Sequence, residues 1–341
     1  MSGKIRFLGL VTLLGLLGAV LLLGVSGWAQ KAKPPKPPQP PTPPADPAIV
    51  YIANNYKGAA MQKTVGRLMV MNADGSNQRT VLSETGVEYL DPTWSPDGTQ
   101  LVFIRHNIVS RASGIYIINV NGTGLRLVLD GVDGNFEGPA TWSPQPLADG
   151  NYKLALCYSV RRPDGTYEID HDAFFMNLDG TGMVRMTDTP GTWESPIYWS
   201  PEADEVTFPA VEPETGRGGF GVYTINYAAE TETFSLTPRL ICGEFPCGIW
   251  AYHQDKLALG HNNDIWLCDI STNDPFLSNQ VTFTPTAGEL IMSWSPDDLK
   301  ILFVQLPSGG LYVINSDGSG GLVQISGENF TWRSPRWRRN P

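Results

Sequence analysis

The sequence is poor in cysteine, histidine and positive charge. Its 341 residues include 4 cysteines, 4 histidines and 24 lysines and arginines, against 34 aspartates and glutamates, so the formal net charge is -10. So few cysteines cannot build a disulfide scaffold, which means that the core must come from packing. The acidic excess argues against a phosphate-binding surface and therefore against a nucleic-acid partner. No G-x-S-x-G nucleophile elbow occurs, and we assign no catalytic residue.

The first 29 residues have the pattern of an export signal. Lys4 and Arg6 precede an apolar run of seventeen residues, 7–23, and small residues stand before a cut after Ala29. Because the run is longer than the roughly 7–15 residues of most signals, an uncleaved N-terminal membrane anchor stays open as an alternative. Either outcome predicts an exported protein, periplasmic or extracellular.

Residues 30–47 form a proline-rich linker. Nine prolines fall between Pro34 and Pro47. Such a segment adopts an extended polyproline II conformation of about 3.1 Å per residue, so the linker predicts a spacer of about 50 Å. The folded domain is expected over residues 48–341.

The folded part is periodic, and its anchor is a tryptophan followed by a turn and a β-rich run. Trp94-Ser95-Pro96-Asp97-Gly98 leads to Leu101, and Trp294-Ser295-Pro296-Asp297 leads to Ile301, seven positions after the anchor. Spacings of 43 to 57 residues suit a four-stranded propeller blade. Six tryptophans serve as anchors, one of them with a degenerate turn: Trp94, Trp142, Trp199, Trp250, Trp294 and Trp337.

A second signature precedes the anchor by about 20 residues. Asn72-Ala73-Asp74-Gly75-Ser76 is one of four copies, and each copy follows an apolar β run. Asp-Gly and Asn-Gly tolerate the positive φ angles of tight hairpins, so these motifs predict turns. They lack the length and the terminal glutamate of an EF-hand calcium loop. The other copies begin at Asn119, Asn177 and Asn315.

The two ends of the domain predict how the ring closes. After Trp337 only four residues remain, whereas three β runs without an anchor stand at the front, at 49–52, 68–71 and 80–82. One C-terminal strand should therefore join three N-terminal strands, which removes an exposed sheet edge. The prediction is an all-β, six-bladed β-propeller.

The repeat P-x-W-S-P-D-G-x-x-L-x-F, followed by Y-x-x-N-x-D-G, resembles the WD40-like (PD40) repeat of TolB-type β-propellers, which also occurs in prolyl-oligopeptidase-type peptidases. The resemblance covers residues 48–341 and implies the fold, whereas function depends on the loops. TolB proper carries an additional N-terminal domain that engages a membrane partner. This chain has the proline linker at that position, so the resemblance does not extend to that role.

The connections that enter each anchor strand suggest a binding site at the mouth of the central channel. Five or six positions before the tryptophans, glutamates and aromatic residues recur, which predicts an acidic, aromatic-lined mouth on the face that carries the B–C and D–A loops. Inter-blade packing of these side chains is the alternative. The predicted binding residues are Glu88, Tyr89, Glu137, Glu194, Trp193, Glu244, Phe245, Glu289, Trp332 and Arg333.

These features favour a non-enzymatic, monomeric module that binds an envelope or extracellular protein or peptide, with an N-terminal membrane tether left open. The alternative is an enzyme at the channel mouth, a glycan hydrolase or lyase, or an accessory propeller of a peptidase system. No cofactor is expected, although Ca²⁺ held by the channel glutamates stays open. Cys157 and Cys268 are expected in the core, on different blades. Cys242 and Cys247 either close a local disulfide loop or are two reduced thiols.

Overall fold

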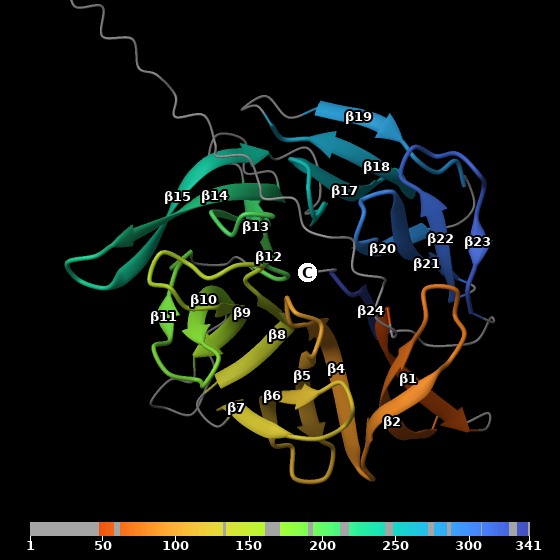
Figure 1. Ribbon diagram of the computed structural model, residues 1–341, viewed down its shortest axis with the longest axis horizontal. Helices are drawn as coiled ribbons and strands as arrows, with labels where there is room; N and C mark the ends of the chain where they lie inside the picture. The colour runs from red at the N-terminus through yellow and green to blue at the C-terminus, as the bar shows by residue number, and fades with distance from the viewer. Residues whose placement is uncertain are drawn as a thin grey trace, which may run out of the picture. The chain divides into compact units, whose positions relative to one another are not determined.

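The computed structural model describes residues 48–57, 62–131, 134–160, 171–189, 194–211, 218–242, 248–271, 276–284, 288–307, 309–326 and 333–339. These residues form six four-stranded antiparallel sheets arranged as blades around a central axis (Figure 1). The predicted six-bladed β-propeller is thus confirmed. The predicted leader, 1–29, and linker, 30–47, lie outside the described residues.

Each blade has four strands, A to D from the axis to the rim, and blades are numbered 1 to 6 along the chain. Blade 1 contains β24 (Arg333–Trp337), β1 (Ile49–Lys57), β2 (Gln62–Met71) and β3 (Arg79–Ser83). Blade 2 contains β4 (Val87–Trp94), β5 (Gln100–Asn107), β6 (Ser113–Asn119) and β7 (Arg126–Asp130). Blade 3 contains β8 (Gly134–Trp142), β9 (Lys153–Val160), β10 (Asp172–Asn177) and β11 (Val184–Arg185).

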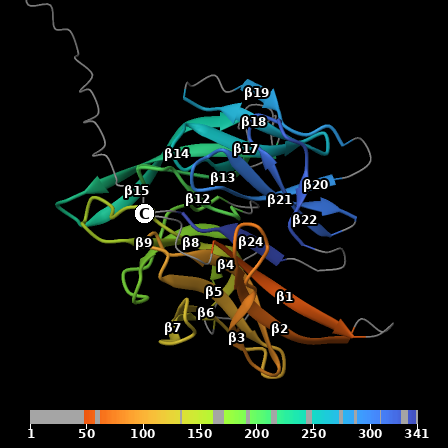
Figure 2. The same ribbon diagram turned by 45° about the vertical axis from the view of Figure 1, so that its right-hand side comes forward.

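The remaining three blades follow the same order. Blade 4 contains β12 (Tyr198–Trp199), β13 (Glu205–Val211), β14 (Gly218–Ala228) and β15 (Thr233–Cys242). Blade 5 contains β16 (Ile249–Trp250), β17 (Lys256–His261), β18 (Asp264–Asp269) and β19 (Phe276–Gln280). Blade 6 contains β20 (Gly288–Trp294), β21 (Lys300–Leu306), β22 (Gly310–Asn315) and β23 (Val323–Gln324). The β14–β15 hairpin projects outward from the ring (Figures 1 and 2).

The ring closes in blade 1, as the sequence predicts. The C-terminal strand β24 pairs antiparallel with the N-terminal strand β1, with Ile49 opposite Trp337 and Val50 opposite Arg336. The strand β24 consequently lies near the axis of the ring (Figure 1). Closure by strands from both ends ties the two ends of the domain together and pairs the edge of β1 that faces the axis.

The hydrophobic core lies between neighbouring blades. Leu101 and Phe103 of β5 pack toward blade 1, whereas Val102 and Ile104 of the same strand pack toward blade 3. Because alternate side chains of a strand point to opposite faces, a strand covered on both faces is apolar at every position. This explains the unbroken apolar runs of the sequence.

Hydrogen bonds of the anchor turn account for the Trp-Ser-Pro-Asp motif. In blade 2 the Ser95 hydroxyl donates to Asp97 Oδ1 (2.6 Å) and accepts from the Gln100 amide (2.9 Å). The same two contacts recur in blade 6 around Ser295. The serine and aspartate side chains therefore satisfy polar groups at the turn, as Asx and serine turns do elsewhere.

The anchor tryptophans join neighbouring blades. Trp94 Nε1 donates to the carbonyl oxygen of Arg336 (3.1 Å), and Trp199 Nε1 donates to that of Thr141 (3.1 Å). In blade 6, Trp294 Nε1 reaches Ile249 in the same way (2.9 Å). In each case the acceptor is the residue before the anchor of the preceding blade, so the indole fixes the spacing of the inner strands.

The Asp-Gly motifs are turns, as predicted. Asp179 Oδ1 accepts from the Thr181 amide (3.0 Å), and Gly180 has a φ of 86°. A Cβ atom at Gly180 would lie 2.0 Å from the carbonyl oxygen of Val128 in the preceding blade. Glycine is thus required both by the left-handed backbone and by the close approach of the neighbouring blade.

Blade 5 lacks the Ser-Pro-Asp turn, and its neighbour supplies the missing contacts. Asp298 stands in blade 6 where blade 2 has Gly98, and its φ of 58° is left-handed. Its buried carboxylate accepts from the amide of Tyr252 (2.6 Å) and from the amide of His253 (2.7 Å). The two departures from the repeat therefore compensate each other across one blade junction.

Two smaller points concern the cysteines and the lengths of the first two strands. Cys157 and Cys268 are buried on β9 and β18, as predicted, whereas the Cys242 side chain and Cys247 lie outside the described residues. The first two strands are longer than the β runs expected at 49–52 and 68–71, because their pairing continues to Tyr56 opposite Lys63 and beyond. Pairing between the two strands lengthens both of them beyond their apolar runs, and the local sequence does not indicate this.

Candidate functional site

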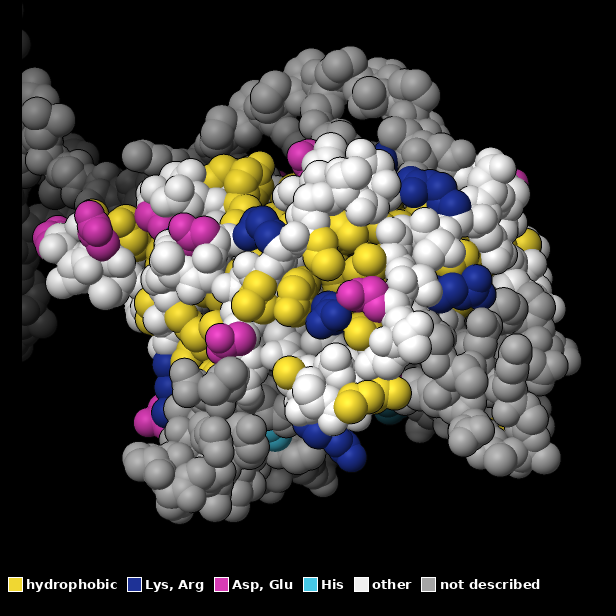
Figure 3. Space-filling view, turned by 90° about the horizontal axis from the view of Figure 1, so that it is seen from below, with side chains coloured by type: hydrophobic (Ala, Val, Ile, Leu, Met, Phe, Trp, Pro, Cys, Tyr) yellow, Lys and Arg dark blue, Asp and Glu magenta, His cyan; other side chains and the backbone are white. Residues whose placement is uncertain are grey.

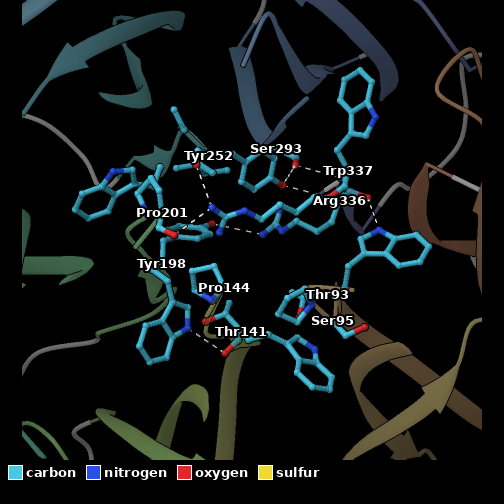
Figure 4. Close-up of a pocket in the computed structure, with 18 of the residues that line it drawn as sticks. Thr93, Ser95, Thr141, Pro144, Tyr198, Pro201, Tyr252, Ser293, Arg336 and Trp337 are labelled. Atoms are coloured by element: carbon cyan, nitrogen blue, oxygen red, sulfur yellow. Dashed lines mark hydrogen bonds between the residues drawn. The ribbon is translucent and has the colours of Figure 1, made fainter. Parts of the chain in front are cut away.

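A cavity of about 130 Å³ lies at the axis of the ring, where the inner strands end at the anchor tryptophans (Figure 4). Every blade contributes side chains to its wall. The lining includes Trp94, Trp142, Trp199, Trp250 and Trp337, with Pro96, Pro144, Pro201, Tyr198, Tyr252, Met292, Arg336 and Arg339 among the other residues. We call this cavity the central pocket.

The central pocket lies on the face of the ring that carries the A–B and C–D turns. Ser95 and Pro96, which belong to an A–B turn, are part of its lining. The sequence analysis placed the binding site at the opposite mouth, on the face of the B–C and D–A loops. The recurrence of glutamates and aromatic residues before the anchors does not show which end of the ring holds a cavity.

Two arginines of the C-terminal segment enter the central pocket. Arg339 donates from Nη2 to the carbonyl oxygens of Pro201 (3.1 Å) and Tyr252 (3.0 Å), and its guanidinium lies 5.3 Å from the centroid of the Tyr252 ring. Burial lowers the pKa of Arg339. The guanidinium of Arg336 lies 5.9 Å from the ring centroid of Tyr198. Both geometries are within the range of cation–π contacts.

The hydrogen bonds of Arg336 hold its side chain in place. Its Nη1 donates to the carbonyl oxygen of Met292, and its Nη2 lies 3.4 Å from the Tyr198 hydroxyl, as Figure 4 shows. Tyr252 contributes a hydroxyl 3.4 Å from Ser293 Oγ, and burial raises the pKa of Tyr252. The pocket wall is thus a rigid set of aromatic, proline and arginine side chains.

Tyr89, one of the predicted mouth residues, packs between blades 1 and 2. Its ring is 1% exposed and meets Phe103 edge-to-face, and its hydroxyl donates to Glu84 (3.1 Å). Burial raises the pKa of Tyr89. Glu88 is half-buried on β4. Tyr89 therefore has the inter-blade packing role that was the alternative to a place at the mouth.

Glu194 and Glu289, two of the predicted mouth glutamates, are buried in matching networks. Glu194 accepts from the Thr187 hydroxyl and from the Ala173 amide (3.0 Å). Glu289 accepts from the hydroxyls of Thr282 and Thr284, the second at 2.9 Å. These carboxyls bind within the fold rather than pointing into an open mouth.

Burial also changes the acidity of these two glutamates. Desolvation raises the pKa of Glu194, although hydrogen bonds from Thr187 and Ala173 oppose the shift and the nearby Asp172 adds to it. Desolvation raises the pKa of Glu289 in the same way, with hydrogen bonds from Thr282 and Thr284 opposing it. The raised pKa and the internal hydrogen bonds both mark these glutamates as structural groups of the fold.

The other six predicted side chains lie outside the described residues, so the predicted acidic mouth as a whole stays a prediction: Glu137, Trp193, Glu244, Phe245, Trp332 and Arg333. Sequence reasoning missed Tyr198, Tyr252, Arg336 and Arg339. A sequence signal that could have found them is a residue next to an anchor tryptophan that differs from its equivalents in the other blades. Directly before the anchor, for example, blades 2 and 3 have Thr93 and Thr141, whereas blades 4 and 1 have Tyr198 and Arg336.

In the described part of the chain, no three histidine, cysteine, aspartate or glutamate side chains gather where they could hold a metal ion. No helix there is long and apolar enough to cross a membrane.

A family model for the TolB β-propeller domain (PD40) matches residues 46–340. The chain belongs to the TolB β-propeller family. No curated protein sequence matches it. The family assignment agrees with the repeat, since both cover the whole ring.

Solved structures share the fold of this TolB-family propeller. TolB from Acinetobacter baumannii superimposes with a TM-score of 0.62 at 18% identity, covering 86% of this chain and 67% of that one. A protein assigned as TolB from Agrobacterium tumefaciens gives 0.53 at 15% identity, with coverage of 84% and 91%. Hydrazine synthase from Kuenenia stuttgartiensis gives 0.56 at 12% identity, with coverage of 86% and 47%. At these identities the likeness establishes the fold.

Proposed function

We propose that this TolB-family propeller is an exported, non-enzymatic binding module that holds a segment of an envelope or extracellular protein at the axis of the ring. The observation that carries the proposal is the central pocket, to which all six blades contribute aromatic, proline or other side chains. Pockets of this kind, concave and mostly apolar with a few placed polar groups, are the usual form of binding sites.

The rigidity of the pocket wall supports binding rather than a merely structural gap. The inner strands are fixed to one another by the indole hydrogen bonds of Trp94, Trp199 and Trp294. Since the wall is already ordered, binding of a partner segment carries little entropic cost for ordering the wall, and more of the contact energy contributes to affinity.

Export is proposed from the leader and the linker. The apolar run 7–23 and the small residues before position 30 direct the domain across a membrane, and the proline linker separates it from the N-terminus. Membrane tethering follows if the leader is not cleaved. The folded domain is proposed to act as a monomer, because each of its six blades, including the closing blade 1, takes all four strands from one chain.

The enzyme alternative has less support. Two carboxyl pairs, Glu194 with Asp172 and Glu289 with Asp264, accept hydrogen bonds from threonines within the fold. A glycoside hydrolase needs two carboxyls that flank an accessible bond. The likeness to hydrazine synthase, of which this chain covers 47%, shows that the fold also occurs as part of an enzyme and does not assign one here.

The test is pocket-dependent capture of a partner. Full-length protein and a Tyr198→Ala variant are used as bait on envelope and secreted extracts, with Tyr227→Ala as the matched control. Tyr227 lies on the projecting hairpin, where its ring packs against Phe234 at 4.8 Å, far from the pocket lining. We expect a partner that both the native chain and Tyr227→Ala retain and that Tyr198→Ala loses.

A companion variant examines the opposite mouth. Glu137→Gln and Glu244→Gln together remove two of the predicted glutamate charges and leave the buried networks of Glu194 and Glu289 intact. Capture that is lost in this variant and kept in Tyr198→Ala would move the site to the face of the B–C and D–A loops. Capture that no pocket variant changes would contradict the proposal.

A further inference from the structure

The central pocket is positively charged in an acidic protein. Its lining contains Arg336 and Arg339 and, in the described part of the chain, no aspartate or glutamate. The whole sequence has a net charge of -10. Figure 3, a view from the side of the ring, shows charged side chains of both signs among hydrophobic ones, so the single sign of the pocket is a local feature.

The two guanidinium groups have neutral partners within the described structure. An arginine carries five N–H donors. The Nη2 group of Arg339 donates hydrogen bonds to the carbonyl oxygens of Pro201 and Tyr252. No described carboxylate lies within ion-pair distance of Arg336 or Arg339.

The acidic groups nearest to Arg339 are already engaged or exposed. Asp298 is buried and accepts from two backbone amides of the neighbouring turn. Glu202 is exposed to solvent and accepts from the Gln145 side chain (3.1 Å). Neither carboxylate neutralises the guanidinium directly, so the pocket keeps positive charge in a partly desolvated place, where a charge interacts more strongly than in water.

The orientation of both guanidiniums suits a carboxylate. Arg339 stacks on Tyr252 and Arg336 on Tyr198, which holds each planar fork in one position. Both hydrogens of Arg339 Nη2 are taken by the carbonyl oxygens of Pro201 and Tyr252, so a carboxylate would meet the remaining N–H donors of Arg339 and Arg336 through charge-assisted hydrogen bonds. Much of the ordering of the arginine side chains is thus complete before a ligand arrives.

The size of the pocket limits the ligand. A cavity of about 130 Å³ is well below the roughly 300–1,000 Å³ of most small-molecule sites. It has room for one side chain or one chain end of a polypeptide. We propose that the central pocket takes a carboxylate presented by an acidic segment of a partner protein, with Arg339 and Arg336 as the binding residues. This inference rests on the proposed binding function and names the chemistry of the partner.

The test measures binding of three unlabelled peptides to the full chain by isothermal titration calorimetry. Hexaglutamate amide presents side-chain carboxylates, hexaglutamine with a free C-terminus presents a chain-end carboxylate, and hexalysine amide presents none. We expect at least one carboxylate peptide to bind, more weakly at higher salt because exposed charges are screened, and hexalysine not to bind. The peptide that binds identifies the source of the carboxylate.

Variants connect the binding to the pocket. Arg339→Gln should weaken binding of the carboxylate peptide by about tenfold or more, whereas Arg339→Lys, which keeps the charge and loses the fork, should weaken it less. The matched control is Arg126→Gln. Arg126 also donates to a backbone carbonyl of the next blade, that of Leu178 (2.8 Å), but it is an exposed residue on the rim.

Each other outcome contradicts the inference. The inference is overturned if Arg339→Gln binds the carboxylate peptide as tightly as the native chain does. It is also overturned if hexalysine binds as tightly as the carboxylate peptides, or if neither carboxylate peptide binds at millimolar concentration. A partner captured through the pocket but not displaced by the carboxylate peptides would refute the acidic ligand and leave the binding function intact. Loss of pocket-dependent capture would instead refute the binding function itself.

Discussion

Replacing Asp298 by glycine tests whether one blade supplies the turn contacts that its neighbour lacks. The variant restores the Ser-Pro-Asp-Gly turn that blade 2 has at Gly98 and removes a non-glycine residue with a φ of 58°. Local turn chemistry alone would predict a more stable protein. The contacts of the carboxylate across the blade junction predict the opposite.

The magnitude follows from two hydrogen bonds. The carboxylate accepts from the amides of Tyr252 at 2.6 Å and His253 at 2.7 Å. A hydrogen bond to a charged group contributes about 1.5–3 kcal/mol net, so the two together contribute roughly 3–6 kcal/mol. Glycine adopts the left-handed backbone without the steric cost that aspartate has there, which offsets about 1–2 kcal/mol of this loss. We therefore expect Asp298→Gly to lower the free energy of unfolding by roughly 2–4 kcal/mol.

Equilibrium urea unfolding measures this loss, and amide hydrogen exchange locates it. The matched control is Asp297→Gly. Asp297 accepts from Ser295 and Leu299 within its own turn, but its side chain is exposed, so water can replace its hydrogen bonds and the loss should be about 1 kcal/mol. Exchange of the Tyr252 and His253 amides should accelerate in Asp298→Gly and not in the control. An Asp298→Gly protein as stable as the native chain, or no less stable than the control, would refute the reasoning.

Three further predictions address the blades, the buried carboxyls and the closure of the ring. Gly180→Ala should cost about 3 kcal/mol or more in urea unfolding, since its Cβ would meet a backbone oxygen of the preceding blade, whereas Gly150→Ala, with the same left-handed backbone and open space, should cost about 1 kcal/mol. Because burial raises the pKa of Glu194 and Glu289, the folded chain keeps protons that the unfolded chain loses above about pH 4.5, so stability should fall as pH rises through the raised pKa. A Glu194→Gln, Glu289→Gln double variant should flatten that fall in a series of melting temperatures, and an unchanged pH profile would argue against it. Deleting the last ten residues, which removes β24, should lower the melting temperature far more than a tail truncation usually does, and an unchanged value would contradict closure by that strand.

The irregular positions of the repeat show where sequence reasoning reached its limit. Trp250 can be recognised as a degenerate anchor from its spacing, yet nothing local indicates that its turn is completed by Asp298, 48 positions later. The predicted mouth was derived from a recurring glutamate, and the same recurrence arises from the paired threonine networks that bury Glu194 and Glu289. Recurrence in a repeat reports either function or packing, and only contacts distinguish the two.

The sequence by itself determined the architecture, because strand alternation, turn chemistry and the spacing of the anchors are local properties that each blade repeats. Even the closure of the ring followed from counting strands at the two ends. The tertiary structure alone decided the candidate site. Arg336 and Arg339 lie near the C-terminus, Tyr198 and Tyr252 lie on two other blades, and they meet only because the ring brings the ends of all inner strands to one axis. The charge and size of the central pocket arise from that convergence.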